Sequence, residues 1–165
     1  MPIGAKLFEL ISGIRRRLLC IWGAIPIPEI IMEEPMDFED RDDETFLRGK
    51  TFDVVSESDW IQGAKTFTAL TPGAARYFLG AYLLRVVNDF SRSDSPYRCY
   101  GLPTIVLVSC LLNSSLIEPV IAMLSAEERS LVAEIIALMI EHSTVFDLRT
   151  DEIEGLKQRR ALLNG

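Results

Sequence analysis

The stretch TALTPGAARYFLGAYLL, residues 68–84, alternates very small residues with bulky aromatic and aliphatic ones. Thr71 followed by Pro72 is typical of a helix start, because a threonine hydroxyl caps the first turn and proline at the first helical position loses no hydrogen bond. Apolar residues then recur at three- and four-residue steps, which places them on one helix face: Ala75, Phe78, Leu79, Tyr82, Leu83, Val86 and Phe90. We therefore predict a core helix that begins after Thr71.

Two pairs of small residues lie seven positions apart in this predicted helix: Gly73 with Ala74, and Gly80 with Ala81. Seven residues are about two helical turns, so the pairs stack on the same side. A glycine inside a helix destabilises it by roughly 0.5–1 kcal/mol relative to alanine, so a compensating close contact is expected. That contact is either another helix of the same core or a partner groove edged by Arg76 and Tyr77, types common at binding hot spots.

Most of the remaining chain is also predicted to be helical. Ser125 and Glu128 form a capping-box pattern at the start of a helix over residues 126–142. Period-two strands are scarce, although the β-branched run 104–106 leaves one strand possible. Further helices are expected over residues 5–23, 42–49, 102–112, 115–124 and 150–163, and a short one, with Ser56 as its N-cap, that holds Trp60.

These elements predict an all-α fold, an irregular single-domain bundle of six or seven helices over residues 1–165. Its parts are an N-terminal helix, a proline-rich acidic connector and a helical core, over residues 5–23, 24–45 and 46–165.

The connector becomes strongly acidic after three prolines that forbid a continuous helix. A calcium loop of the EF-hand type needs a central glycine, and none lies between Gly23 and Gly49. We expect a solvated acidic surface that docks a cationic protein partner. The predicted partner-binding residues are Glu39, Asp40, Asp42, Asp43, Glu44, Trp60, Arg76 and Tyr77.

The overall charge points away from nucleic acid. The net charge of the 165 residues is −7, whereas phosphate binding needs clustered lysine and arginine. The three cysteines form no CxxC pair, which favours a reduced setting. The apolar run after Arg17 is broken by Gly23 and Pro26, unlike a signal peptide, and no uninterrupted apolar stretch has the length of a membrane span. We therefore expect a cytoplasmic protein without an integral membrane span.

The span from about Pro26 to Leu138 resembles an uncharacterised family of small bacterial proteins. The shared features are a proline-bearing turn, an acidic DDE element at residues 42–44, Trp60, and the motif LTPxAxRYxLxAxL at residues 70–83. The segment LSAEERSLVAEIIALM, residues 124–139, resembles a second family segment. The chain departs from the family pattern at Gly80, where a proline is expected. The resemblance implies a helical fold and no established activity.

Catalytic and cofactor motifs are scarce. His142 is the only histidine, and its place at the end of a predicted helix suits a surface cation stabilised by the helix dipole. No nucleophile elbow, P-loop or dinucleotide fingerprint is present. One histidine and scattered thiols are a poor set for zinc. We therefore predict no catalytic residues, no metal and no cofactor.

Three functions remain open. The first is a non-enzymatic protein-binding module, more specifically a bacterial immunity protein that neutralises a basic toxin. The second is a small enzyme or ligand-binding protein with a Tyr/Arg-lined pocket, in which Arg76 clamps an anion and His142 serves as base. The third is a membrane-peripheral or assembly component that uses the amphipathic helix over residues 5–23.

Overall fold

The computed structural model describes residues 4–34, 36–58, 61, 67–91 and 102–165. The protein is an all-α single body, as predicted, with eight helices whose bounds lie within these residues. Seven of them have at least seven residues, in line with the predicted six or seven, and the eighth is α3, a helix of six residues. The β possibility at residues 104–106 is wrong, since these residues lie inside α6.

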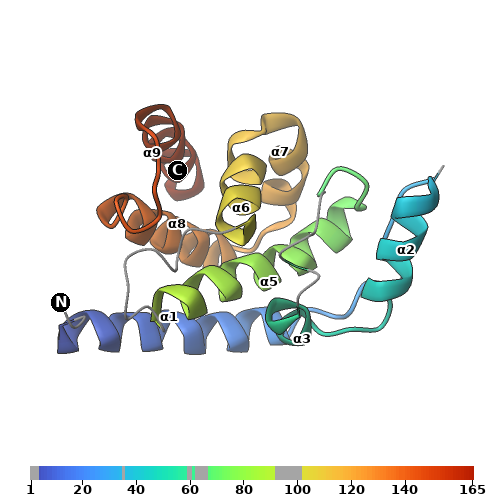
Figure 1. Ribbon diagram of the computed structural model, residues 1–165, viewed down its shortest axis with the longest axis horizontal. Helices are drawn as coiled ribbons and strands as arrows, with labels where there is room; N and C mark the ends of the chain where they lie inside the picture. The colour runs from blue at the N-terminus through green and yellow to red at the C-terminus, as the bar shows by residue number, and fades with distance from the viewer. Residues whose placement is uncertain (1–3, 35, 59–60, 62–66, 92–101) are drawn as a thin grey trace.

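The first helix, α1 (Ala5–Gly23), has the predicted bounds. It lies along one edge of the molecule in Figure 1. Its buried side chains recur at helical spacing and face the core: Ile11, Ile14, Leu18 and Trp22. Leu10, next to Ile11 in the sequence, lies outside that stripe and is exposed.

Helix α5 (Pro72–Ser91) runs through the middle of the molecule, between α1 and the C-terminal helices (Figure 1). The predicted start is confirmed: the Thr71 hydroxyl accepts from the amide of Ala74 at 3.3 Å. The same hydroxyl donates to the carbonyl of Ile30 at 3.0 Å, which ties the connector to the helix start. All seven residues of the predicted apolar face are buried. Other helices surround α5, so its burial extends well beyond one face.

The small residues of α5 serve the protein's own core. A Cβ atom on Gly80 would lie 2.2 Å from Cδ1 of Trp22. The indole of Trp22 therefore occupies the space that a side chain at Gly80 would need, and its Nε1 donates to the carbonyl of Arg76 at 3.0 Å. Ala74 and Ala81 are also fully buried. The sequence predicts that the small residues contact either another helix of the same core or a partner, and the structure shows the contact within the core.

The connector is extended only as far as Asp37. Met32 forms an isolated antiparallel bridge with Leu70, and the amide of Thr71 donates to Ile31 at 2.9 Å. Helix α2 (Phe38–Leu47) begins inside the predicted connector and earlier than the expected residue 42. The reason is a capping box that Asp37 forms with Asp40.

Helix α3 (Phe52–Glu57) follows α2 and packs against α5. The predicted N-cap at Ser56 is wrong, because Ser56 lies within α3 and its hydroxyl donates to the carbonyl of Asp53 at 2.6 Å.

The C-terminal half contains α6 (Leu102–Leu112), α7 (Ser114–Met123), α8 (Ala126–Glu141) and α9 (Thr150–Asn164). The predicted capping box of Ser125 and Glu128 starts α8. Arg159 of α9 is buried and donates to the carbonyl of Leu111 at 2.8 Å and to Ser114 Oγ at 3.1 Å. A cation at the C-terminus of α6 suits the helix dipole, which helps to explain why an arginine is tolerated there.

Candidate functional site

The predicted partner-binding residues do not gather at one place. Five lie in α2, at one end of the molecule in Figure 1, and Arg76 and Tyr77 lie in the first turns of α5. Trp60 lies outside the described residues. The structure therefore offers an acidic helix and, separately, the surroundings of Arg76 and Tyr77.

Helix α2 contacts the body mainly through its C-terminal end, where Leu47 is buried and Phe46 packs against the core. Phe38 at its N-terminus is 78% exposed. The carboxylates differ in their roles: Asp40 closes the capping box and Glu44 pairs with Arg48 at 2.6 Å. The remaining three acidic residues are Glu39, Asp42 and Asp43, of which the first two are exposed and the third half-buried. The helix presents an acidic surface with an aromatic side chain at its start.

Arg76 is engaged inside the protein. Its Nε and Nη2 bond to the two carboxylate oxygens of Glu128 at 3.0 and 2.8 Å, a bidentate pair. The side chain of Glu128 is 2% exposed and also takes part in the capping box of α8. This ion pair joins α5 to α8. It satisfies the positive charge of the guanidinium, so an external anion is not needed to explain the arginine at this position. A role for Arg76 in partner binding stays a prediction.

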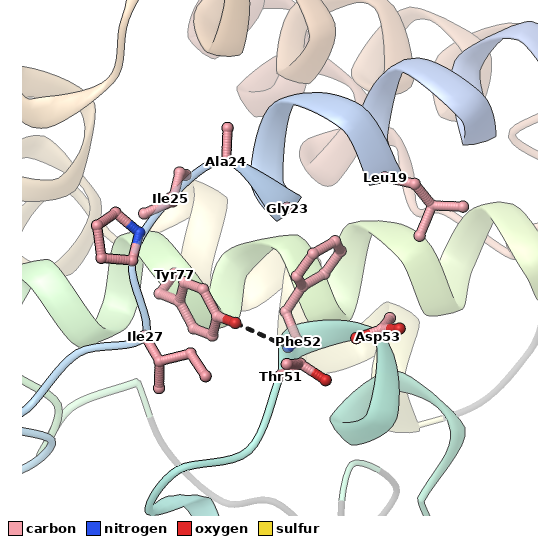
Figure 2. A pocket seen from close by; sticks show the side chains of 10 residues that line it. Leu19, Gly23, Ala24, Ile25, Ile27, Thr51, Phe52, Asp53 and Tyr77 are labelled. Carbon is pink, nitrogen blue, oxygen red and sulfur yellow. Dashed lines mark hydrogen bonds between the residues drawn. The ribbon is translucent and has the colours of Figure 1, made fainter.

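Tyr77 closes the inner side of a surface groove between the end of α1, the start of the connector and α3 (Figure 2). Its hydroxyl accepts from the amide of Phe52 at 3.3 Å, and the two rings meet edge to face at 6.0 Å. Burial raises the pKa of the Tyr77 hydroxyl, and the negative charge of Asp53 adds to that rise, although the bond from Phe52 opposes it. Tyr77 is therefore a neutral wall of the groove near neutral pH.

The groove has a volume of about 390 Å³ and a mainly apolar lining. Asp53 is the one charged residue among those that line it. The lining residues are Leu19, Gly23, Ala24, Ile25, Pro26, Ile27, Thr51, Phe52, Asp53 and Tyr77. A single carboxylate beside a neutral phenol gives no acid–base pair matched to catalysis, whereas an apolar floor with one rim charge suits binding.

His142 does not join Arg76. It caps the C-terminus of α8, half-buried, with its ring 5.1 Å from that of Phe90, while Arg76 contacts Glu128 at the other end of the same helix. A helix of this length spans roughly 24 Å at about 1.5 Å per residue. The base and the anion clamp of the predicted catalytic pocket are therefore far apart. His142 Nε2 is buried and has no hydrogen-bond partner in the part of the chain that the structure describes.

Two other buried groups are far from ionisation at neutral pH. Burial raises the pKa of Cys110 to about 12, against the lowering effect of nearby Arg159. Burial also raises the pKa of Tyr82 well above its ordinary value. Both side chains pack in the core as uncharged groups, which is a structural role.

In the described ranges, no group of three or more His, Cys, Asp or Glu side chains is placed to hold a metal ion. No single helix of these residues has both the length and the apolarity to cross a membrane. Pro103–Leu112 and Ser114–Met123 meet that requirement only together, as a pair bent by 85°.

Compared with protein-family models, curated proteins and solved structures, the chain shows no match. The resemblance to the family with the LTPxAxRYxLxAxL motif stays a prediction.

Sequence reasoning placed Tyr77 near a binding surface and missed the rest of the groove. Thr51, Phe52 and Asp53 reach it because α3 folds back onto α5, a long-range contact without a local sequence signal. The sequence signal that indicates this groove is the segment IPIP, residues 25–28. Its two prolines keep the chain extended, so the end of α1 is not covered by a continuing helix.

Proposed function

We propose that this protein is a non-enzymatic protein-binding module that docks a basic partner on α2 and its surroundings. The observation that carries the proposal is the exposure of α2, an acidic helix with a single buried residue and an aromatic side chain, Phe38, that is 78% exposed. Because only the C-terminal end of the helix, Phe46 with Leu47, packs against the core, the charge and exposure of the rest of α2 are better explained by an external contact.

The charge of the surface favours a cationic partner. Opposite charges accelerate encounter and align the two surfaces, and the net charge of −7 acts in the same direction. Phe38 supplies the apolar contact that charges alone lack, since aromatic residues are enriched at the centres of interfaces. Ile30, on the connector before α2, is a further exposed apolar residue, with 71% of its side chain accessible.

The more specific proposal is a bacterial immunity protein that binds a co-encoded basic toxin in the cytoplasm. The support for it is a small, acidic, single-bodied chain whose arginine and histidine are not brought together in a catalytic arrangement. An inhibitor of this kind needs a fast association with a basic protein, which an exposed acidic helix provides.

The test is affinity capture from the native host at low salt, followed by association kinetics with the retained protein. Replacing Glu39 by Gln and Asp42 by Asn is expected to slow association and to flatten its salt dependence, with the fold intact. Asp40 and Glu44 are left unchanged because they hold the helix together. The matched control makes the same charge change on α9, Asp151→Asn with Glu154→Gln, and is expected to have a smaller effect. Recovery of no stoichiometric protein would count against the proposal.

A second candidate keeps some support from α1. Phe8 and Leu10 are 58% and 44% exposed near its N-terminus, as an interfacial membrane helix requires. Arg17, in contrast, is paired with Glu134 of α8 at 2.6 Å, and this ion pair would compete with an anionic headgroup. Removal of α1 would expose the core around Trp22, so the double variant Phe8→Ser, Leu10→Ser is the better test. Loss of flotation with anionic vesicles would favour this candidate, and equal behaviour would remove it.

A further inference from the structure

The groove between α1, the connector and α3 (Figure 2) has an apolar floor and one charged residue at its rim. We propose that it is an anchor site for a protein partner, taking up an aliphatic side chain that is followed by a lysine or arginine, with the cation paired to Asp53. This inference rests on the proposed function and deepens it, because it assigns a second contact and its sequence chemistry to the same basic partner.

The floor is suited to an aliphatic side chain. Leu19 of α1, Phe52 of α3 and Ile27 of the connector contribute apolar side chains to the lining (Figure 2). Ile27 is 38% exposed, so a ligand that covers it removes apolar surface from water. The volume of about 390 Å³ lies within the range of roughly 300–1,000 Å³ that is usual for binding pockets.

The rim selects for a cation. Asp53 is exposed and is the one charged residue in the lining. Four cations of the described residues around the groove have partners elsewhere: Arg85 contacts Asp89 and the carbonyl of Ser56, Arg76 pairs with Glu128, Lys50 lies over the ring of Phe46, and Arg15 bonds to Asn88. The exposed carboxylate of Asp53 is therefore placed to meet a positive charge from another molecule.

The walls of the groove are fixed before binding. The bond from the amide of Phe52 to the Tyr77 hydroxyl holds the start of α3 against α5. The bond from Thr71 to the carbonyl of Ile30 holds the connector on the same helix. A ligand thus meets a preformed surface, and little ordering of the protein opposes binding.

The charge of the chain argues against the other occupants. A second copy would bring a further net charge of −7 to an acidic surface, so electrostatic repulsion opposes self-association through the groove. A metal ion would find only one carboxylate in the lining. A basic protein segment satisfies both the floor and the rim.

In the experiment, the methyl groups of the full chain are isotope-labelled. The chain is then titrated with each of two capped dipeptides, N-acetyl-leucyl-lysinamide and N-acetyl-leucyl-glutaminamide. The expected result is a shift of the Leu19, Ile25 and Ile27 methyl signals, with binding of the lysine peptide about three- to fivefold tighter. Asp53→Asn is expected to abolish that preference and leave binding of the glutamine peptide unchanged. Equal binding of both peptides by the wild-type chain, or shifts away from the groove, would overturn the proposal.

Two isoleucine variants separate this proposal from the proposed function. Ile27→Glu places a charge in the groove, while Ile30→Glu makes the same change three residues later at a more exposed position outside the lining. Loss of peptide binding in the first variant alone supports the groove. A captured partner could bind the Ile27→Glu variant with the same affinity as the wild type and yet lose affinity when Glu39 and Asp42 of α2 are neutralised. In that case the anchor site is wrong and the proposed function stands. If the lysine peptide binds as expected and no partner is captured, the proposed function fails instead.

Discussion

The contact between α1 and α5 and the surface of α2 are built from opposite kinds of residue. In the first, Trp22 fills the space above Gly80 so closely that a single added carbon would overlap it. In the second, Phe38 stands 78% exposed among carboxylates. Both regions are predicted from the sequence as possible sites of binding. The structure shows that Gly80 of α5 contacts the protein's own Trp22, whereas binding of another molecule at the acidic helix stays a proposal.

The largest expected effect concerns the close contact between Gly80 of α5 and Trp22 of α1. Gly80→Leu is expected to lower the free energy of unfolding by about 3 kcal/mol, because a side chain at this position would overlap the fully buried ring of Trp22. Urea denaturation measures the change. Gly13→Ala in α1 is the control, since nothing lies within 4 Å of a Cβ atom there. It is expected to be neutral or slightly stabilising through helix propensity. Equal stability of the two variants would show that the contact is loose.

Next in size is the ion pair between α5 and α8. Arg76→Met is expected to destabilise the protein by about 2 kcal/mol, because it leaves the buried carboxylate of Glu128 without its cation. The loss is moderated by the bonds of Glu128 within the capping box of α8. A double-mutant cycle with Glu128→Gln, followed by urea denaturation, measures the coupling. A coupling near zero, together with lost partner binding, would return Arg76 to the binding surface.

Alkaline pH should weaken the core while leaving α2 unaffected. The pKa of Cys110 is raised to about 12 in the folded protein, so the folded state keeps a proton that the unfolded state releases at lower pH. Stability is therefore complete below the unfolded pKa and falls as pH rises from about 9 towards 12, by up to about 1.4 kcal/mol per pH unit. Cys110→Ala should reduce this slope, measured by urea denaturation at several pH values. An unchanged slope would contradict the assignment, and Cys20→Ala, at an exposed thiol, is the control.

The smallest expected effect concerns α2. Phe38→Ser is expected to change the free energy of unfolding by less than about 0.5 kcal/mol, because its side chain contributes little buried surface. Thermal denaturation, with Leu47→Ser as the destabilising comparison from the buried side of the same helix, measures the difference. If Phe38→Ser destabilises as strongly as Leu47→Ser, the acidic helix is part of the core and the proposed docking surface is wrong.

Local signals predicted the helices well. Thr71 with Pro72 and Ser125 with Glu128 marked the starts of α5 and α8, since capping depends on residues close in sequence. The start of α2 differs from the predicted residue 42 because Asp37 caps the helix, and the sequence does not distinguish this aspartate from the other charges of the acidic connector. The burial of α5 extends beyond the predicted face, since it depends on how many other helices surround the helix.

The candidate site was harder to predict than the fold. Glu128 lies 52 residues from Arg76, and nothing local indicates that the two meet. The same is true of Phe52 and Tyr77, which are 25 residues apart. Periodicity identifies which face of a helix is apolar, and it carries no information on which distant polar group satisfies a given arginine or tyrosine.

The burial of Trp22 gives the protein an internal optical reporter. Its indole is fully enclosed and its N–H is bonded to the backbone of α5, so its fluorescence should be that of a tryptophan in an apolar setting. With Trp60 replaced by phenylalanine, the emission of the chain would come from this one ring. Any event that lifts α1 from α5 would then appear as a shift to longer wavelength, observable in real time without an added dye.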